Sequence, residues 1–185
     1  MRLKLFIAAL AAFAVAAFAG WTATLHWIPY KATDDLWNRF LSLSMKQNQL
    51  NEPLVRSARR NTIPMDNADT MTRATIYDVS DGPVVFEAEV PGDIEYWSVS
   101  AYAHNTDTIF VANDQDTGPG PYRLLIRKEG QSATAPADDV AVSPSDRGFL
   151  IIRAVMRDRN DAAHVAKLKT EVAKSSLRPL SAIQP

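Results

Sequence analysis

The chain has 185 residues, 46% of them hydrophobic and 22% charged, and its formal net charge at neutral pH is -1. Because basic and acidic residues are interspersed, we expect no nucleic-acid partner. The absence of cysteine excludes disulfides, thiolate metal sites and a cysteine nucleophile.

The first thirty residues predict a transmembrane anchor. An uncharged, mostly apolar run from Leu5 to Ile28 follows Arg2 and Lys4. As a helix this run would be roughly 36 Å long, enough to cross a hydrocarbon core of about 30 Å. The basic residues mark the near end as cytoplasmic, and aromatic rings are expected at the far membrane interface. These rings belong to Trp21, Trp27 and Tyr30.

A cleaved secretory signal is the alternative for this segment. Ala17-Phe18-Ala19 forms a small-x-small cleavage site behind a short apolar core. Hydrophobicity continues past Ala19 to Ile28, however, which is longer than a signal core needs. We therefore favour an anchor that the mature chain retains.

Four residues of the anchor are candidates for contact with a partner helix. Small residues spaced by four allow close helix packing, and an ionisable residue at membrane depth is often functional. The candidates are Ala8, Ala12, Ala16 and His26. The simpler interpretations, an apolar alanine anchor and a hydrated interfacial histidine, stay open.

Residues 31–66 predict a helix followed by a connecting loop. Thr33 is typical of a helix N-cap, and apolar residues then recur at spacings of four and three on a helix that ends near Gln49. We favour packing of this helix on the domain over a position on the membrane surface. Pro53 and Pro64 predict a loop over 51–67.

Residues 67–185 predict a β domain with a C-terminal helix, because the apolar period changes to two after Asp69. The predicted strands are 70–79, 84–90, 95–103, 108–112, 122–127 and 149–156. Ser80-Asp81-Gly82-Pro83 predicts a hairpin turn between the first two strands, and 129–147 predicts a polar surface loop. Asp158 or Asn160 can cap the last helix.

Several motifs resemble the bacterial family called domain of unknown function 1254. Asn67-Ala68-Asp69-Thr70 leads a strand that ends in Ser80-Asp81-Gly82-Pro83-Val84, the order of that family's Asn-x-Asp-Thr and Ser-x-Gly-Pro-Val motifs. Arg153, a helix opened by Asp161, and Leu177-Arg178-Pro179-Leu180-Ser181 resemble the end of the family's domain. The resemblance covers most of the chain after residue 60.

The resemblance implies a mainly β, antiparallel sandwich-like domain that is membrane-attached or exported. With the anchor and flanking helices the fold class is α+β overall. Combined with the anchor, the resemblance predicts a bacterial inner-membrane protein with a cytoplasmic N-terminus and a periplasmic main domain. Family members are often encoded with or fused to a companion, domain of unknown function 1214, which suggests a protein partner. The resemblance implies no established reaction.

The Asn-x-Asp-Thr motif and two residues elsewhere are candidate ligand-binding residues. Asn, Asp and Thr side chains commonly satisfy turn amides, so the simpler role of the motif is to fix the entry of the first strand. A polar-ligand site would need one of the two other residues folded beside the motif. The candidates are Asn67, Asp69, Thr70, His104 and Arg60.

His104 ends a stripe of alternating polar residues, which is either a ligand-binding surface or the solvated face of an antiparallel sheet. Ser98 or Ser100 with His104 and Asp107 has the residue types of a hydrolytic triad. Alternate residues on a strand lie about 6.6 Å apart, however, which is too far for a direct hydrogen bond. Residues 113–118 resemble part of a calcium loop but lack its bidentate glutamate, which favours an ordinary acidic turn.

We expect no catalytic residue, metal or cofactor, because the chain has few histidines and no carboxylate pair of assignable geometry. The favoured function is a non-catalytic accessory module that contacts the lipid bilayer. Its periplasmic domain would bind the companion-domain protein or a larger membrane complex. The alternative is an envelope glycan- or lipid-binding, or hydrolytic, protein that uses Asn67, Asp69 and His104.

Overall fold

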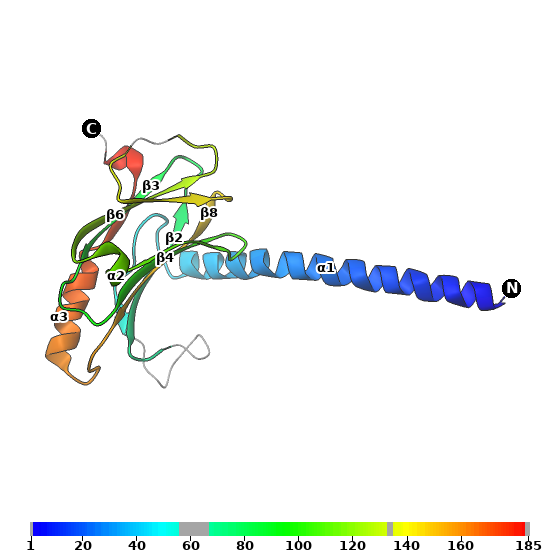
Figure 1. Ribbon diagram of the computed structural model, residues 1–185, viewed down its shortest axis with the longest axis horizontal. Helices are drawn as coiled ribbons and strands as arrows, with labels where there is room; N and C mark the ends of the chain where they lie inside the picture. Colours follow the sequence, from blue (N-terminus) through cyan, green and yellow to red (C-terminus); the bar gives the residue numbers. More distant parts are fainter. Residues whose placement is uncertain (1, 56–66, 133–134, 184–185) are drawn as a thin grey trace.

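The computed structural model describes residues 2–55, 67–132 and 135–183. A long N-terminal helix projects from a β domain, and a shorter helix lies on the side of the domain away from the N-terminus (Figure 1). In chain order the elements are α1 (Arg2–Ser42), β1 (Leu54–Val55), β2 (Thr70–Asp78), β3 (Val84–Val90), β4 (Trp97–Ala103), β5 (Thr108–Asn113), α2 (Asp114–Thr117), β6 (Gly120–Lys128), β7 (Asp139–Ser143), β8 (Arg147–Val155), α3 (Ala162–Ala173), β9 (Ser176–Pro179) and the 3-10 helix η1 (Leu180–Ala182).

The expected anchor and the helix expected after it are one continuous helix, α1. It runs for 41 residues through Pro29, which removes one main-chain hydrogen bond without ending the helix. Thr33 is buried inside α1 and is not an N-cap, because the apolar run before it is already helical. α1 ends at Ser42, short of the predicted Gln49, and Ser44 then adopts the left-handed region at φ 60.

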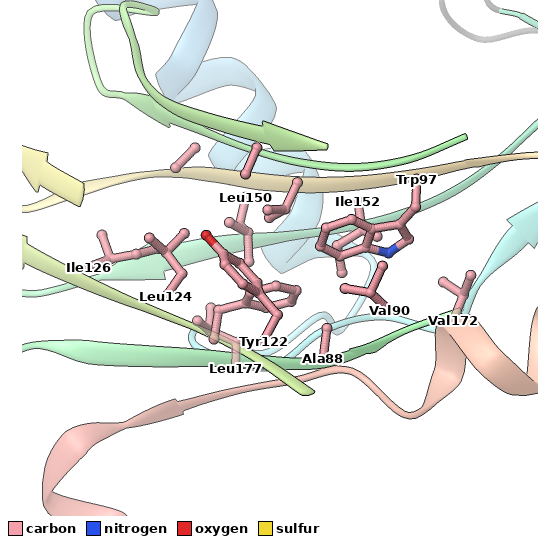
Figure 2. Packing of buried hydrophobic residues seen from close by; sticks show 14 of the residues in the cluster. Ala88, Val90, Trp97, Tyr122, Leu124, Ile126, Leu150, Ile152, Val172 and Leu177 are labelled. Carbon is pink, nitrogen blue, oxygen red and sulfur yellow. The ribbon is translucent and has the colours of Figure 1, made fainter. Parts of the chain in front are cut away.

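The strands form two mostly antiparallel sheets. The five-stranded sheet has the order β1-β2-β8-β4-β5, and the four-stranded sheet has the order β7-β6-β3-β9, with β6 and β7 parallel. One core lies between the sheets, where Trp97 and Leu150 from the first sheet meet Leu124 and Leu177 from the second (Figure 2). The prediction of a sheet-rich, mostly antiparallel domain with flanking helices is therefore confirmed.

The predicted hairpin between the first two long strands is wrong. β2 pairs with β1 and β8, whereas β3 pairs with β6 and β9 in the other sheet. The Asp-Gly turn does reverse the chain, with Gly82 at φ 138. Because both edges of each strand are occupied by other partners, the turn carries the chain from one sheet to the other.

Three short strands were not predicted. β7 lies within the segment 129–147 that the sequence predicts as a polar loop, and it pairs in parallel with β6. β1 and β9 have two and four residues. Segments of this length are too short to show a period of two, so the alternation that reveals the longer strands is missing.

Tyr77 and Gly148 bring three strands into close contact at the end of the sheet where α1 docks. Burial raises the pKa of Tyr77 to about 12. Its hydroxyl therefore stays protonated and donates to the main-chain oxygen of Tyr102 at 3.0 Å. A Cβ atom at Gly148 would lie 2.0 Å from that same oxygen, so glycine is required here.

α3 is held at both of its ends. The carboxylate of Asp161 caps the N-terminus by accepting hydrogen bonds from the amides of residues 163 and 164. This corrects the proposed caps Asp158 and Asn160, since Asp158 instead accepts from the amide of Asn160 in the preceding turn. At the other end the buried guanidinium of Arg73 donates to the main-chain oxygens of residues 172 and 173.

Candidate functional site

Three polar side chains converge where α1 meets the β domain. The Nε2 atom of His104 and an Nη2 atom of Arg147 each lie 2.9 Å from one oxygen, Oδ1 of Asp34. Asp34 comes from α1, His104 follows β4, and Arg147 opens β8. Because an ionised carboxylate only accepts hydrogen bonds, Nε2 of His104 is the donor in its contact with Asp34. We call these three residues the helix-foot cluster.

Aromatic rings extend this contact along one face of α1. The ring centroid of Tyr30 lies 5.2 Å from that of His104, edge to face, and 5.4 Å from that of His26. Two helical turns further on, the guanidinium of Arg147 lies 5.4 Å from the ring centroid of Trp37, a cation–π arrangement. The face of α1 that makes these contacts runs from the apolar segment directly onto the domain.

Apolar packing completes the attachment of α1. Trp37 is 4% exposed and packs with Ile76 and Phe149 on the five-stranded sheet. The ring of Phe40 lies 6.0 Å from that of Phe149. Full burial of one large apolar side chain stabilises a fold by about 2 to 3 kcal/mol. The C-terminal turns of α1 are therefore part of the domain.

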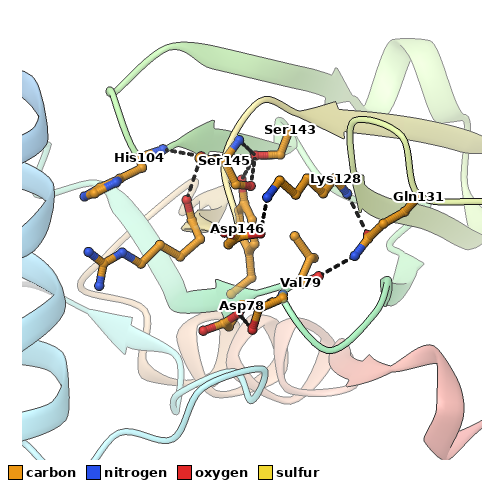
Figure 3. A network of polar contacts seen from close by, with 11 residues as sticks. Asp78, Val79, His104, Lys128, Gln131, Ser143, Ser145 and Asp146 are labelled. Carbon is orange, nitrogen blue, oxygen red and sulfur yellow. Dashed lines mark hydrogen bonds and ion pairs between the residues drawn. The ribbon is translucent and has the colours of Figure 1, made fainter.

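A hydrogen-bond network connects the helix-foot cluster to both sheets (Figure 3). The amide of His104 donates to Oγ of Ser145, and that hydroxyl donates to the main-chain oxygen of Arg147, both at 3.0 Å. Ser143 on β7 donates to the main-chain oxygen of Ser145 at 2.8 Å and lies 3.3 Å from the hydroxyl of Tyr77 on β2. The position of α1 is thus fixed relative to the four-stranded as well as the five-stranded sheet.

The Asn-x-Asp-Thr motif forms the turn that leads into β2. Oδ1 of Asn67 accepts from the amide of Asp69 at 2.9 Å, and the amide of Thr70 donates to the main-chain oxygen of Asn67 at 3.3 Å. The Asp69 carboxylate lies 3.9 Å from the guanidinium of Arg159. These contacts are those of a turn that fixes the entry of a strand.

The motif and His104 lie at opposite ends of the five-stranded sheet. β2 pairs with β8 from Thr70 opposite Val155 to Asp78 opposite Arg147, a span of about 26 Å at 3.3 Å per residue. The structure therefore does not bring the motif together with His104. Arg60, the remaining ligand candidate, lies outside the described residues.

The residues of the hypothetical triad do not converge either. His104 pairs with Asp34, whereas the carboxylate of Asp107 accepts from the side-chain amide of Asn105 at 2.6 Å. Ser98 and Ser100 are 2% and 4% exposed, so this face of β4 is not simply a solvated one.

The calcium-like segment 113–118 forms a capped helical turn. The side chain of Asn113 accepts from the amides of residues 115 and 116, and the carboxylate of Asp116 accepts from the amide of Asn113. Within residues 2–55, 67–132 and 135–183, no group of three or more His, Asp or Glu side chains is placed to hold a metal ion.

The anchor candidates all lie on α1, and all except Tyr30 are exposed. Trp21 and Trp27 are 65% and 57% exposed, and the three alanines proposed for partner-helix packing are exposed as well. Tyr30 is half-buried because its ring meets His104, and His26 contacts the ring of Tyr30 on the same helix.

Asp34 and Arg147 are the two members of the cluster that sequence reasoning misses. Asp34 follows a presumed N-cap, where acidic residues are common, and Arg147 falls in a segment predicted as a polar loop. The usable signal is that Asp34 shares a helical face with Tyr30 and Trp37. A carboxylate on an otherwise aromatic face predicts a cationic partner from elsewhere in the fold.

A shallow hollow of about 420 Å³ lies on the outer face of the four-stranded sheet, lined in part by Glu87, Arg123 and Pro136. Glu87 accepts hydrogen bonds from Arg123 on β6 and from Arg178 on β9. The carboxylate of Glu87 is therefore paired with an arginine on each of the two neighbouring strands.

Comparison with known proteins identifies a family and a fold. Residues 47–175 match the family described as "Protein of unknown function (DUF1254)". The crystal structure of the VPA0106 protein from Vibrio parahaemolyticus superposes with a TM-score of 0.72 at 15% identity, over 87% of this chain and 37% of that one. A putative uncharacterized protein from Burkholderia cenocepacia matches at TM-score 0.48 and 12% identity, over 73% of this chain and 36% of that one.

The chain thus spans little more than a third of the length of these two proteins. No curated protein matches the chain. The match over residues 47–175 confirms the resemblance that the motifs indicate.

Proposed function

This chain belongs to the DUF1254 family, and we propose that it is a single-pass inner-membrane protein whose periplasmic β domain is a non-catalytic, partner-binding module of a membrane protein complex. The observation that carries the proposal is the continuity of α1. This helix joins an exposed apolar segment to a docked C-terminal end without a linker.

The N-terminal part of α1 supports a membrane anchor. Within the described residues it is long and apolar enough to span a bilayer, and the rest of the chain buries none of its most apolar stretch. Phe6, Phe13 and Phe18 are 66%, 71% and 70% exposed. A contiguous apolar surface of this length favours a lipid environment over water.

The C-terminal part of α1 favours retention over cleavage of the apolar segment. A signal sequence also fits the length and composition. Cleavage after Ala19 would leave Trp21, Leu25 and Trp27 on a helix that projects from the domain, where they are 65%, 51% and 57% exposed. Retention keeps these side chains beside lipid.

The contacts that the candidate polar side chains make within the fold support a non-catalytic role. His104 is held between Asp34 and Tyr30 and contributes to the attachment of α1. The Asn-x-Asp-Thr motif forms hydrogen bonds within its own turn, and it lies at the end of the five-stranded sheet opposite to His104. No nucleophile with a base in reach is formed by these candidates.

The length of the VPA0106 chain supports a protein partner. The fold shared with this chain takes up 37% of that protein, so the module is there joined to further polypeptide. The family resemblance implies a companion, domain of unknown function 1214. We infer that a protein carrying the companion domain binds the β domain described here.

The anchor is tested by washing native membranes with alkaline carbonate, followed by gentle detergent extraction and intact-mass measurement of a C-terminally tagged chain. We expect the chain in the washed membranes with residues 1–19 present. A matched variant, Leu10→Lys with Phe13→Lys, places charges in the apolar segment and leaves the helix-foot cluster untouched, so it should be released. A soluble chain that begins at Gly20 overturns the anchor.

The partner is tested on the same detergent extract by affinity capture. Co-purification of the companion-domain protein at fixed stoichiometry supports the module. A full-length, membrane-extracted chain that purifies alone in the presence of that protein contradicts it.

A further inference from the structure

The apolar segment and the β domain are separated by almost no chain. The apolar run ends at Ile28, and the ring of Tyr30, two residues later, already contacts His104. Two residues advance a helix by about 3 Å. Asp34, which binds His104 and Arg147, is about 9 Å beyond Ile28 along the axis.

α1 does not pivot freely at this junction. Thr33 and Trp37 are 3% and 4% exposed, and the helix continues without interruption to Ser42. The network through Ser145 and Ser143 fixes His104 to both sheets. The distance between the apolar segment and the β domain along α1 is therefore fixed by the fold and not by a flexible linker.

The loop between β4 and β5 contacts α1 within two residues of the end of the apolar segment. It includes His104, and it lies beside the C-terminal half of α1 in Figure 1. The remaining side chains of the loop are polar, and three of them are exposed. The loop is formed by His104, Asn105, Thr106 and Asp107, and we include with it Thr108, the first residue of β5.

The thickness of the lipid headgroup layer indicates which part of the membrane surrounds the loop. A hydrocarbon core of about 30 Å within a membrane of about 40 to 45 Å leaves a headgroup layer of about 5 to 7 Å on each side. A contact made about 3 Å beyond the end of the apolar run falls inside this layer. Exposed hydroxyl, amide and carboxylate groups suit the headgroup layer, and the loop has no large apolar side chain that would enter the hydrocarbon.

We propose that the β domain sits directly on the bilayer that α1 spans, with the loop of residues 104–108 in the lipid headgroup layer. The occupant of this surface is the lipid headgroup itself. The proposal rests on the anchor proposed above and adds the orientation of the domain. α3, on the opposite side of the domain, is then directed away from the membrane and toward other proteins.

Because the chain has no cysteine, one introduced cysteine can be labelled at a chosen position. Single variants Thr108→Cys, Lys169→Cys and Phe18→Cys are labelled with a polarity-sensitive fluorophore. Each full-length chain is placed in vesicles of phosphatidylethanolamine and phosphatidylglycerol that carry nitroxide on either the lipid headgroup or the acyl chain. All three side chains are exposed, so the label should not disturb packing.

We expect headgroup nitroxide to quench the label at Thr108→Cys several-fold more strongly than the label at Lys169→Cys on α3. Acyl-chain nitroxide should quench the label at Phe18→Cys. If Phe18→Cys is quenched while Thr108→Cys is quenched no more than Lys169→Cys, the anchor stands and the proposed orientation is overturned. If Phe18→Cys is not quenched by acyl-chain nitroxide, the anchor itself is overturned.

Discussion

Asp34 and His104 are 70 residues apart in the chain, yet Oδ1 of the first lies 2.9 Å from Nε2 of the second. The contact joins a helix whose other half is exposed and apolar to a loop of the β domain. Because the same carboxylate oxygen also accepts from Arg147, one side chain of α1 holds two donors of the domain. The attachment of α1 therefore depends on Asp34 more than on its acidic neighbour.

Replacing Asp34 with alanine should loosen the attachment of α1. Asp34 is 39% exposed, so the loss of its two charged contacts should lower the free energy of unfolding by only about 1 kcal/mol. The local effect should be clearer, with faster hydrogen exchange in residues 104–108 and at the C-terminal end of α1. Hydrogen exchange of the detergent-solubilised chain measures both segments.

Asp35→Ala is the matched control for this change. Asp35 is 62% exposed and pairs with Lys31 on the same helix. Its removal should leave exchange in residues 104–108 unchanged. Equal exchange in the two variants would show that the helix-foot cluster does not hold α1.

Gly148→Ala should prevent the close approach of β8 to β4. The added Cβ atom would lie 2.0 Å from the main-chain oxygen of Tyr102 and 2.5 Å from the hydroxyl of Tyr77. Backbone atoms in a sheet cannot yield by that amount, so we expect a loss of about 3 kcal/mol in stability. Thermal unfolding measures it, with Gly92→Ala as the control.

The control glycine has space for a methyl group. A Cβ atom at Gly92 would meet the side chain of Pro119 at 3.4 Å, an ordinary contact. We expect its melting temperature to stay close to that of the unchanged chain. Similar melting temperatures for the two variants would contradict the steric argument at Gly148.

The long strands follow from the sequence because their local pattern is strong. Phe86 and Val90 on β3 are buried and Glu89 is exposed, as alternation predicts. Pairing is different, because it depends on partners far away in the chain. The turn at Gly82 is visible in the sequence, whereas the placement of β2 beside β8 and of β3 beside β6 is not.

The contacts within the helix-foot cluster do not follow from local sequence patterns either. His104 is visible as the end of a polar stripe, but its partner comes from a helix that precedes the whole domain. Thr33 gives a strong N-cap signal that the preceding apolar run overrides, because the helix has already formed there. Local signals therefore identify His104 but neither Asp34 nor Arg147, because the topology decides which residues meet.

Arg73→Met should destabilise the C-terminal end of α3. Arg73 is 8% exposed, and its guanidinium donates to the main-chain oxygens of Val172 and Ala173 at 3.2 and 3.0 Å. Methionine fills the space but removes the charged donor, so that the main-chain oxygen of Val172 keeps its hydrogen bonds from Ser175 and loses the charge-assisted one. Charge-assisted bonds to a helix C-terminus are favourable, so we expect a loss of about 3 kcal/mol. Denaturant unfolding and hydrogen exchange at residues 172–175 measure it.

Arg157→Met is the control for the loss of an arginine. Arg157 is 61% exposed, and its contact with Glu95 is solvated. Its removal should leave the denaturant concentration at the unfolding midpoint close to that of the unchanged chain. If both variants unfold at the same denaturant concentration, Arg73 does not stabilise α3 in the manner described.

Glu87 should make the stability of the four-stranded sheet depend on pH in the acidic range. Burial opposes its ionisation, but hydrogen bonds from Arg178 and Arg123 prevail and lower the pKa of Glu87 below its ordinary value of 4.5. A carboxyl whose pKa is lower in the folded than in the unfolded state stabilises the fold above the unfolded value. This contribution is lost as the pH falls through the folded value.

The variant Glu87→Gln keeps the size of the side chain and removes the titrating group. We expect the unchanged chain to melt at a higher temperature than Glu87→Gln near neutral pH, and the gap to narrow as the pH falls from about 5 to 3. Glu89→Gln, at an exposed position of the same strand, should show no such convergence. A difference in melting temperature between the unchanged chain and Glu87→Gln that stays constant over this pH range would mean that the arginines do not favour the ionised form of Glu87. The contacts of Glu87 with Arg123 and Arg178 would then have to stabilise the sheet through packing alone.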